Sequence, residues 1–253
     1  SGCTTLRLVI VFLVAGSLLP NDRLHKIIYT PLADAEQSLD RSHGEPEGVL
    51  HIDMPVAYGR LVVMPIVAAF KVAHPKVALR LQFTDRISDL IDDRLDVIFR
   101  LGELGESSMV ARRFDQVFFG AYASSAFVQR LGRVAHPDDL REAERLCFTL
   151  TNGRPFAFRF ERDGDVVHLP AGSGLVSNDI EGIIEAAALG MGVAFIPTFL
   201  AASVRANLLL PLLPDWRVVG PPVHLLYPTA RHLSSRVRAF VDFAVANAPG
   251  RSG

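Results

Sequence analysis

Patterns typical of strands and helices alternate between Val49 and Gly102, and this alternation constrains the fold more than any other feature of the chain. Apolar residues recur at every second position in the strand patterns and at three- to four-residue spacing in the helix patterns. We expect strands at 49–55, 77–83 and 96–102 and helices at 58–75 and 87–95. Pro65 should kink or restart the first helix, because proline lacks a backbone donor. Such alternation is typical of a mostly parallel α/β sheet with right-handed crossovers.

The second half of the chain predicts further strands and helices with local stop signals. We expect strands at 116–124, 193–197 and 221–228, a helix that begins at Pro137, and a final helix at 234–250. One apolar stripe should run along this final helix, formed by Val237, Phe240, Val241, Ala244 and Ala248. Short antiparallel strands should meet at the turn Asp163–Gly164. The clearest helix should be capped by Asn178, with Glu181 completing a capping box and Gly190 ending it.

Composition places the chain among ordinary globular proteins and gives no sign of a nucleic-acid surface. Its 253 residues carry 26 basic and 27 acidic side chains, a formal net charge of -1. A nucleic-acid-binding surface normally carries an excess of basic residues, so this chain itself should contribute little contact to DNA. Cys3 and Cys147 lie far apart and form no metal-ligand pattern, which argues against a disulfide scaffold or a zinc site.

An apolar run, "LRLVIVFLVAGSLL" at residues 6–19, raises the question of export. It supplies about 14 residues where a membrane-spanning helix needs about 20, so a membrane anchor is disfavoured. Its length suits a signal peptide, but no pair of small residues at cleavage spacing follows it. We expect this segment to be an atypical start to a cytoplasmic protein.

Motifs for catalysis and for cofactor binding are missing from the sequence. It contains neither a G-x-S-x-G nucleophile turn nor the glycine-rich loops that bind phosphate. The five aspartates at 85, 89, 92, 93 and 96 fit the cap and exposed face of a short helix better than a pair of catalytic carboxylates. We therefore expect no enzyme activity, no cofactor and no metal.

A ligand site is expected where the carboxyl ends of the strands meet helix N-termini, because free N–H groups there attract anions. Segments 54–59, 100–102 and 177–182 qualify and come from both halves of the chain, so the site should be a cleft. Arg100 ends an otherwise apolar strand, where its guanidinium could clamp a carboxylate. The alternative is an internal ion pair with Asp96 or Asp85.

Four stretches of the chain, in order and with matching spacing, resemble the effector-binding domain of LysR-type transcriptional regulators. They are "GVLHIDMPVAYGRLVVMPIVAAFKVAHPKVALRLQFTDR", "DLIDDRLDVIFRLGELGESSMVARRF", "AAALGMGVAFIPTFL" and "VHLLYPTARHLSSRVRAFVDF", and the resemblance covers roughly residues 31–248. It implies two Rossmann-like α/β lobes joined by a two-strand hinge, similar to type II periplasmic binding proteins. By position, it implies inducer contacts at Val56, Ala57, Tyr58, Arg100, Leu101, Asn178, Asp179, Phe195, Ile196 and Pro197.

The family often has Ser or Thr where this chain has Val56 or Ala57, which leaves fewer hydroxyl groups to bind a carboxylate. The resemblance also implies a domain layout for the chain. Residues 1–30 form the atypical apolar N-terminus and 31–48 resemble the end of a linker helix; 49–122 and 223–248 form lobe I, and 123–222 form lobe II.

The partners that the resemblance implies are a small-molecule inducer, with an organic acid as one class, and further copies of the chain in a dimer or tetramer. DNA would be bound only through a winged helix-turn-helix head, which we expect to be missing ahead of the linker in this chain. No membrane partner is implied. An exported solute-binding protein of the same fold is the main alternative, but the linker-like "LADAEQSLDRS" and the regulator-like C-terminal segment disfavour it.

Overall fold

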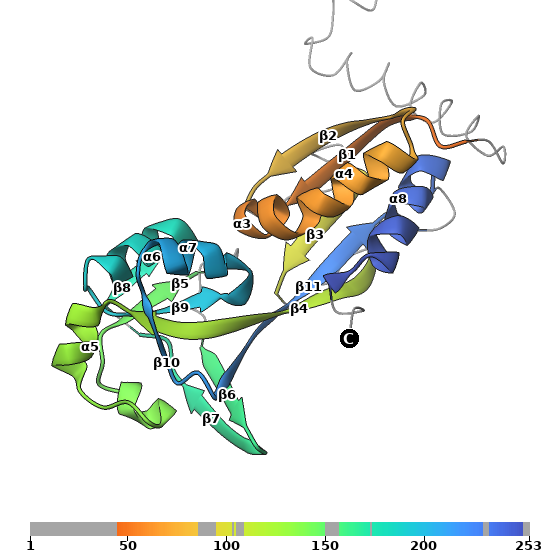
Figure 1. Cartoon of the computed structure of the whole chain (residues 1–253). Helices are drawn as coiled ribbons and strands as arrows, with labels where there is room; N and C mark the ends of the chain where they lie inside the picture. The colour runs from red at the N-terminus through yellow and green to blue at the C-terminus, as the bar shows by residue number, and fades with distance from the viewer. Residues whose placement is uncertain are drawn as a thin grey trace, which may run out of the picture. The chain divides into compact units, whose positions relative to one another are not determined.

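A single mixed sheet runs through the part of the chain that the structure, a computed structural model, describes: residues 45–85, 95–102, 104, 109–149, 157–172, 174–229 and 233–249. The apolar N-terminus, most of the linker-like segment and nearly all of the helix expected at 87–95 lie outside these residues. Its strand order is β2-β1-β3-β11-β4-β9-β5-β8, with β10, β6 and β7 paired beside this path. Figure 1 shows the strands in two α/β lobes.

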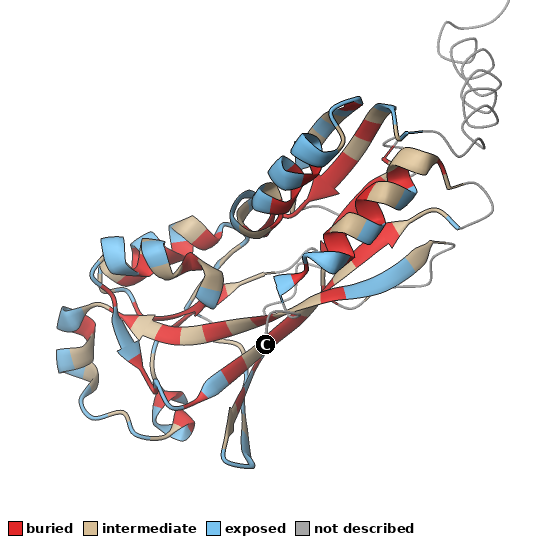
Figure 2. Cartoon of the chain, turned by 45° about the vertical axis from the view of Figure 1, so that its right-hand side comes forward, coloured by how far each residue is buried: buried red, intermediate tan, exposed pale blue. Residues whose placement is uncertain are grey.

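The first lobe contains the parallel strands predicted from the start of the sequence. They are β1 (Gly48–Met54), β2 (Val77–Phe83) and β3 (Val97–Leu101), and β1 pairs in parallel with both of the others. Helices α4 (Met64–Ala73) and α8 (Ser235–Ala246) pack together, with the rings of Phe70 and Phe240 at 5.0 Å. The stripe expected on α8 is buried as predicted, and Figure 2 shows its buried face against the sheet.

The helix expected at 58–75 is divided into three short segments. These are α3 (Val56–Tyr58), a π-helical turn (Gly59–Val63) and α4. Pro65 occupies the first turn of α4, where its missing N–H is tolerated, so the predicted restart at this proline is confirmed. By length and composition the whole run Val56–Ala73 resembles a membrane span, but the buried side chains of α4 face the core of the lobe.

The second lobe is built on three parallel strands and a capped helix. Strand β5 (Arg145–Phe148) lies between β8 (Leu175–Ser177) and β9 (Val193–Pro197) and pairs with both, and α6 (Ile180–Ala188) packs on β5 and β9. The expected cap is wrong by one residue, because Asp179 rather than Asn178 accepts the N–H of Glu181, at 3.2 Å. Gly190, with a φ of 78°, ends the helix as predicted.

Smaller elements complete the second lobe. They are α5 (Ser125–Leu131), the 3₁₀ turns η2 (Pro137–Leu140) and η3 (Thr198–Leu200), β6 (Phe158–Arg162), β7 (Asp165–Leu169), α7 (Ala201–Ala206) and β10 (Leu210–Leu212). Asp163 and Gly164, with φ of 51° and 93°, form the tight turn predicted between β6 and β7. The hairpin is therefore confirmed.

The helix predicted from Pro137 is reduced to the single turn η2. Proline and a capping box formed by His136 and Asp139 start it as the sequence suggests. The buried side chain of Arg145, however, donates to the carbonyls of Leu140 and Arg141, which a longer helix would need for its own backbone bonds. The prediction of a full helix is therefore wrong.

Two long antiparallel strands, β4 (Val110–Ala123) and β11 (Arg217–Tyr227), run through both lobes (Figure 1). One end of this pair lies beside β3 of the first lobe, and the other end of β4 pairs with β9 and β10 of the second. The pairing slips at two places, between Val219 and Pro222 and between Val223 and His224. Such bulges bend a strand pair, so the connection between the lobes is curved.

Candidate functional site

The carboxyl end of β1 leads directly into α3, as expected for the first segment of the site. The N–H of Val56 donates to the Asp85 carboxylate at 3.1 Å, so a side chain that follows β2 occupies the start of α3. Burial raises the pKa of Asp85, the bond from Val56 lowers it, and the negative charge of Asp179 raises it further. Asp179 caps α6 in the other lobe, so the starts of α3 and α6 lie near each other.

Two direct contacts close to these helix starts join the two lobes. The Arg60 guanidinium lies 3.0 Å from the Glu181 carboxylate, and both side chains are largely exposed. The ring of Tyr58 meets the ring of Phe199 edge-on, with their centroids at 5.5 Å. Ala57 also packs against the apolar cluster of the second lobe. Helix α3 and the π-helical turn therefore contact the start of α6 and the turn η3, and these elements form the junction at which the lobes touch.

Tyr58 has an internal hydrogen bond that fixes its hydroxyl. Only 1% of the residue is exposed, and its hydroxyl donates to Asp115 Oδ2 at 2.7 Å. Burial, together with the charge and hydrogen bond of Asp115, raises the pKa of Tyr58. The phenol is thus a neutral donor bound to the connecting strand β4, and its contact with an inducer stays a prediction.

Arg100 lies in β3, opposite His224 of β11, and only 8% of it is exposed. Burial lowers the pKa of its guanidinium, and the negative charge of Asp53 opposes this shift. The two partners considered from the sequence are engaged elsewhere: Asp85 with Val56, and Asp96 with the N–H of His51 at 2.9 Å. The described acidic group whose charge acts on the pKa of Arg100 is Asp53, on the neighbouring strand β1.

The remaining expected contacts lie in different surroundings. Leu101 is half-buried beside Arg100, and Asn178 is exposed next to the cap of α6. Phe195 is stacked on Phe158 at 3.7 Å between ring centroids, and Ile196 belongs to the apolar cluster of the second lobe. Pro197, which is also buried, precedes the 3₁₀ turn that carries Phe199. Segment 195–197 therefore supports the site from within the lobe.

Sequence reasoning missed several residues of this junction. Arg60 and Glu181 are 121 positions apart, and the hydroxyl of Tyr58 reaches Asp115 over 57 positions, so no local pattern could pair them. Asp85 was detectable, because residues that follow parallel strands meet at one edge of a sheet. Within the described residues, His, Cys, Asp and Glu side chains form no group that could hold a metal ion.

Comparison with known proteins gives a consistent result. The family model described as the LysR substrate binding domain matches residues 43–249. An HTH-type transcriptional repressor of Pseudomonas aeruginosa is 33% identical over 222 residues, which are 87% of this chain and 70% of that protein. The HTH-type transcriptional regulator PtxR of the same species is 32% identical over 203 residues, 79% of this chain and 64% of the regulator.

Solved structures agree on the fold. The full-length Vibrio cholerae virulence activator AphB superposes with a TM-score of 0.69 at 22% identity, covering 88% of this chain and 76% of AphB. The regulatory domain of CrgA from Neisseria meningitidis gives a TM-score of 0.63 at 23% identity, covering 80% of this chain and 100% of that domain.

Proposed function

The chain belongs to the LysR substrate-binding domain family, and from this membership we propose that it senses a small molecule between its two lobes. The proposed lobes are residues 49–122 with 223–248, and residues 123–222. The observation that carries the proposal is the junction of α3 and the π-helical turn with α6 and η3, where the Arg60–Glu181 ion pair and the Tyr58–Phe199 ring contact join the lobes. A ligand bound there would change these contacts and the angle between the lobes.

The proposed ligand is a small organic acid whose carboxylate binds Arg100. A guanidinium with little exposure to water binds a carboxylate more strongly than an exposed one, because water screens it less. Val56, Ala57 and Leu101 would provide apolar contacts, and Asn178 and Asp179 would bind polar groups of the ligand. The buried residues Phe195, Ile196 and Pro197 would support the ligand-contacting residues from the interior of the second lobe.

We further propose that the chain is the sensing and dimerising part of a transcriptional regulator. Its relatives are transcriptional regulators, which supports a cytoplasmic protein without enzyme activity and disfavours an exported solute-binding protein. In the whole protein, a change in lobe angle would alter the spacing of DNA-binding heads within a dimer or tetramer. The antiparallel pair β4 and β11 would transmit this change.

A thermal-shift screen against small organic acids tests the ligand proposal. A ligand that binds only the folded protein raises the melting temperature by mass action. We expect at least one acid to raise it, and Arg100→Ala to abolish the rise. Arg80→Ala, on the exposed surface of β2, is the matched control and should keep the full shift. An Arg100→Ala variant that melts cooperatively and keeps the full shift would overturn the assigned role.

A further inference from the structure

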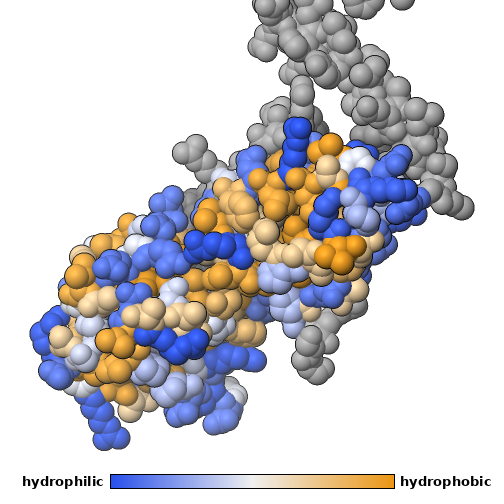
Figure 3. Space-filling model, turned by 45° about the horizontal axis from the view of Figure 1, so that its top comes forward, coloured by the Kyte–Doolittle hydropathy of each residue, from blue (hydrophilic) through white to orange (hydrophobic). Residues whose placement is uncertain are grey.

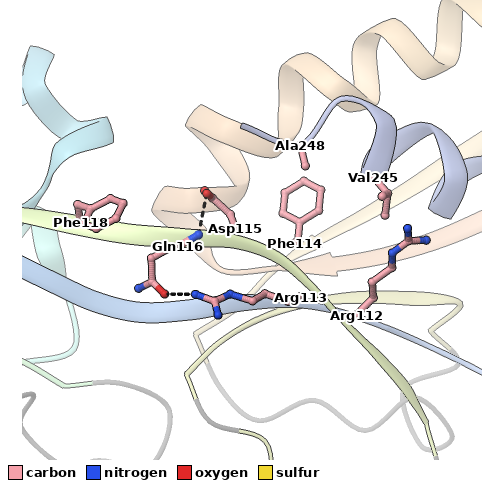
Figure 4. A pocket seen from close by; sticks show the side chains of 8 residues that line it. All are labelled: Arg112, Arg113, Phe114, Asp115, Gln116, Phe118, Val245 and Ala248. Carbon is pink, nitrogen blue, oxygen red and sulfur yellow. Dashed lines mark hydrogen bonds between the residues drawn. The ribbon is translucent and has the colours of Figure 1, made fainter. Parts of the chain in front are cut away.

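A cavity of about 370 Å³ lies where the end of α8 meets β4, on the strand that connects the lobes (Figure 4). Its polar lining includes Arg112, Arg113 and Gln116, and its apolar lining includes Phe114, Val245 and Ala248. Hydrophobic residues also gather on the surface elsewhere in the molecule (Figure 3), and side chains such as Val72 and Leu189 are largely exposed. The cavity is distinctive because it combines buried apolar groups with cationic ones.

The cavity coincides with the irregular part of the strand pair. Arg113 faces His224 and Asp115 faces Val223, which leaves Phe114 as an extra residue in β4. The bulge brings Phe114 and Asp115 to the same side of the strand in Figure 4, instead of opposite sides. A binding site at this position would therefore lie on the bend between the lobes.

A side-chain network holds the bend together. The Gln116 amide donates to the Gly220 carbonyl of β11 at 2.6 Å and accepts from the Arg113 guanidinium at 2.6 Å. Gly220 has no room for a side chain, because a Cβ atom there would lie 2.3 Å from the Phe119 ring. The backbone of the two strands is thus tightly packed beside the cavity.

The charges around the cavity favour an anion. Among the residues that the structure describes, neither Arg112 nor Arg113 forms an ion pair with a carboxylate. The one acidic group of the lining, Asp115, accepts from the Gln116 N–H at 2.7 Å and from the Tyr58 hydroxyl at 2.7 Å. Each of its oxygens accepts one hydrogen bond, and the two guanidiniums of the lining outnumber this single carboxylate.

We propose that this cavity is a second ligand site, separate from the interlobe site, that takes small carboxylates with an apolar body. The carboxylate would bind the Arg112 guanidinium, which Figure 4 shows beside Val245 on the α8 side of the strand. The apolar body would cover the ring of Phe114 and the side chain of Ala248. Arg113, which Figure 4 shows bound to Gln116 on the other side of the strand, would add a more distant positive charge.

Calorimetric titration of the full chain with phenylacetate tests the proposal. Phenylacetamide has the same ring without the charge, and acetate has the charge without the ring, so both should bind much more weakly. The substitution Arg112→Gln should weaken phenylacetate binding about tenfold or more, because a hydrogen bond between two charged groups is lost. Arg80→Gln is the matched control on β2 and should leave the affinity within about twofold.

Amide chemical shifts measured in the same titration locate the bound molecule. We expect the shifts to change at 112–118 and 245–248 and to move little at 56–58 and 177–181. The proposal is overturned if wild-type protein gives no saturable phenylacetate binding at millimolar concentration. It is also overturned if Arg112→Gln binds as tightly as wild type, or if the shifts change at the interlobe segments instead.

Discussion

Replacing Tyr58 by phenylalanine removes one hydroxyl from the junction of the lobes and little else. The ring of Tyr58 would keep its edge-on contact with Phe199, while Asp115 would lose the donor that now lies 2.7 Å from its Oδ2. Asp115 would retain the Gln116 N–H on Oδ1. The substitution therefore isolates one hydrogen bond between α3 and the connecting strand β4.

The expected cost follows from the burial and charge of this bond. A hydrogen bond to a charged group contributes about 1.5–3 kcal/mol, more than a neutral one, and an acceptor that loses its donor in a buried site also bears a desolvation cost. Tyr58 is only 1% exposed, so little water can replace the lost hydroxyl. We expect Tyr58→Phe to lower the free energy of unfolding by about 2 kcal/mol.

Urea denaturation at pH 7, followed by circular dichroism, measures this change. Tyr122→Phe is the control, since this hydroxyl lies on the same strand and the described residues give it no hydrogen bond; its cost should stay below about 0.5 kcal/mol. In a double-mutant cycle with Asp115→Asn, the two substitutions should be coupled. A cost for Tyr58→Phe no larger than that of the control would refute the reasoning.

Three further predictions concern other contacts. Arg60→Gln breaks the ion pair with Glu181 and should lower the free energy of unfolding by less than about 1 kcal/mol, because both side chains are exposed. In urea denaturation, the difference from wild type should disappear at high salt. Burial raises the pKa of Asp85, so its charge destabilises the folded state as the pH rises. Asp85→Asn should therefore be more stable than wild type at pH 7.5 and lose that advantage toward pH 4. An equal advantage at both pH values would contradict this reasoning. Gly192→Ala places a Cβ 2.5 Å from the Glu144 carbonyl and should lower the free energy of unfolding by about 2 kcal/mol or more in the same assay. An unchanged urea midpoint would show that the two strands can separate there.

Elements with strong apolar periodicity were predictable from the sequence, and elements defined by distant contacts were not. The buried strand β9 and the stripe on α8 match their predicted positions, because apolar spacing directly reflects burial. Strand β4 begins at Val110, six residues ahead of the predicted position 116. The sequence did not indicate this first part, because the exposed Arg112 and Arg113 interrupt the apolar pattern. Only pairing with β11 identifies that part as a strand.

The candidate site shows the same division. The segments that form the candidate site were predictable, because strand ends and helix starts can be recognised in the sequence. The residues that contact them from other strands were not predictable: Asp53 acts on Arg100 from the neighbouring strand, and Asp115 binds Tyr58 from β4. The unpredicted helix α5 had local signals, since Ser124 caps it and Gly132 ends it with a φ of 81°.

The shared strands also set the order in which the chain can fold as it is synthesised. Strand β11 lies between β3 and β4 in the sheet, yet it leaves the ribosome only after all of the second lobe. Until then one edge of β3 lacks its native neighbour, and α8, which covers the first lobe, is synthesised later still. An unpaired strand edge can pair wrongly with other chains. A ribosome that stalls between residues 124 and 216 would therefore expose an aggregation-prone half-sheet, and chaperone binding to the nascent chain should be strongest over that interval.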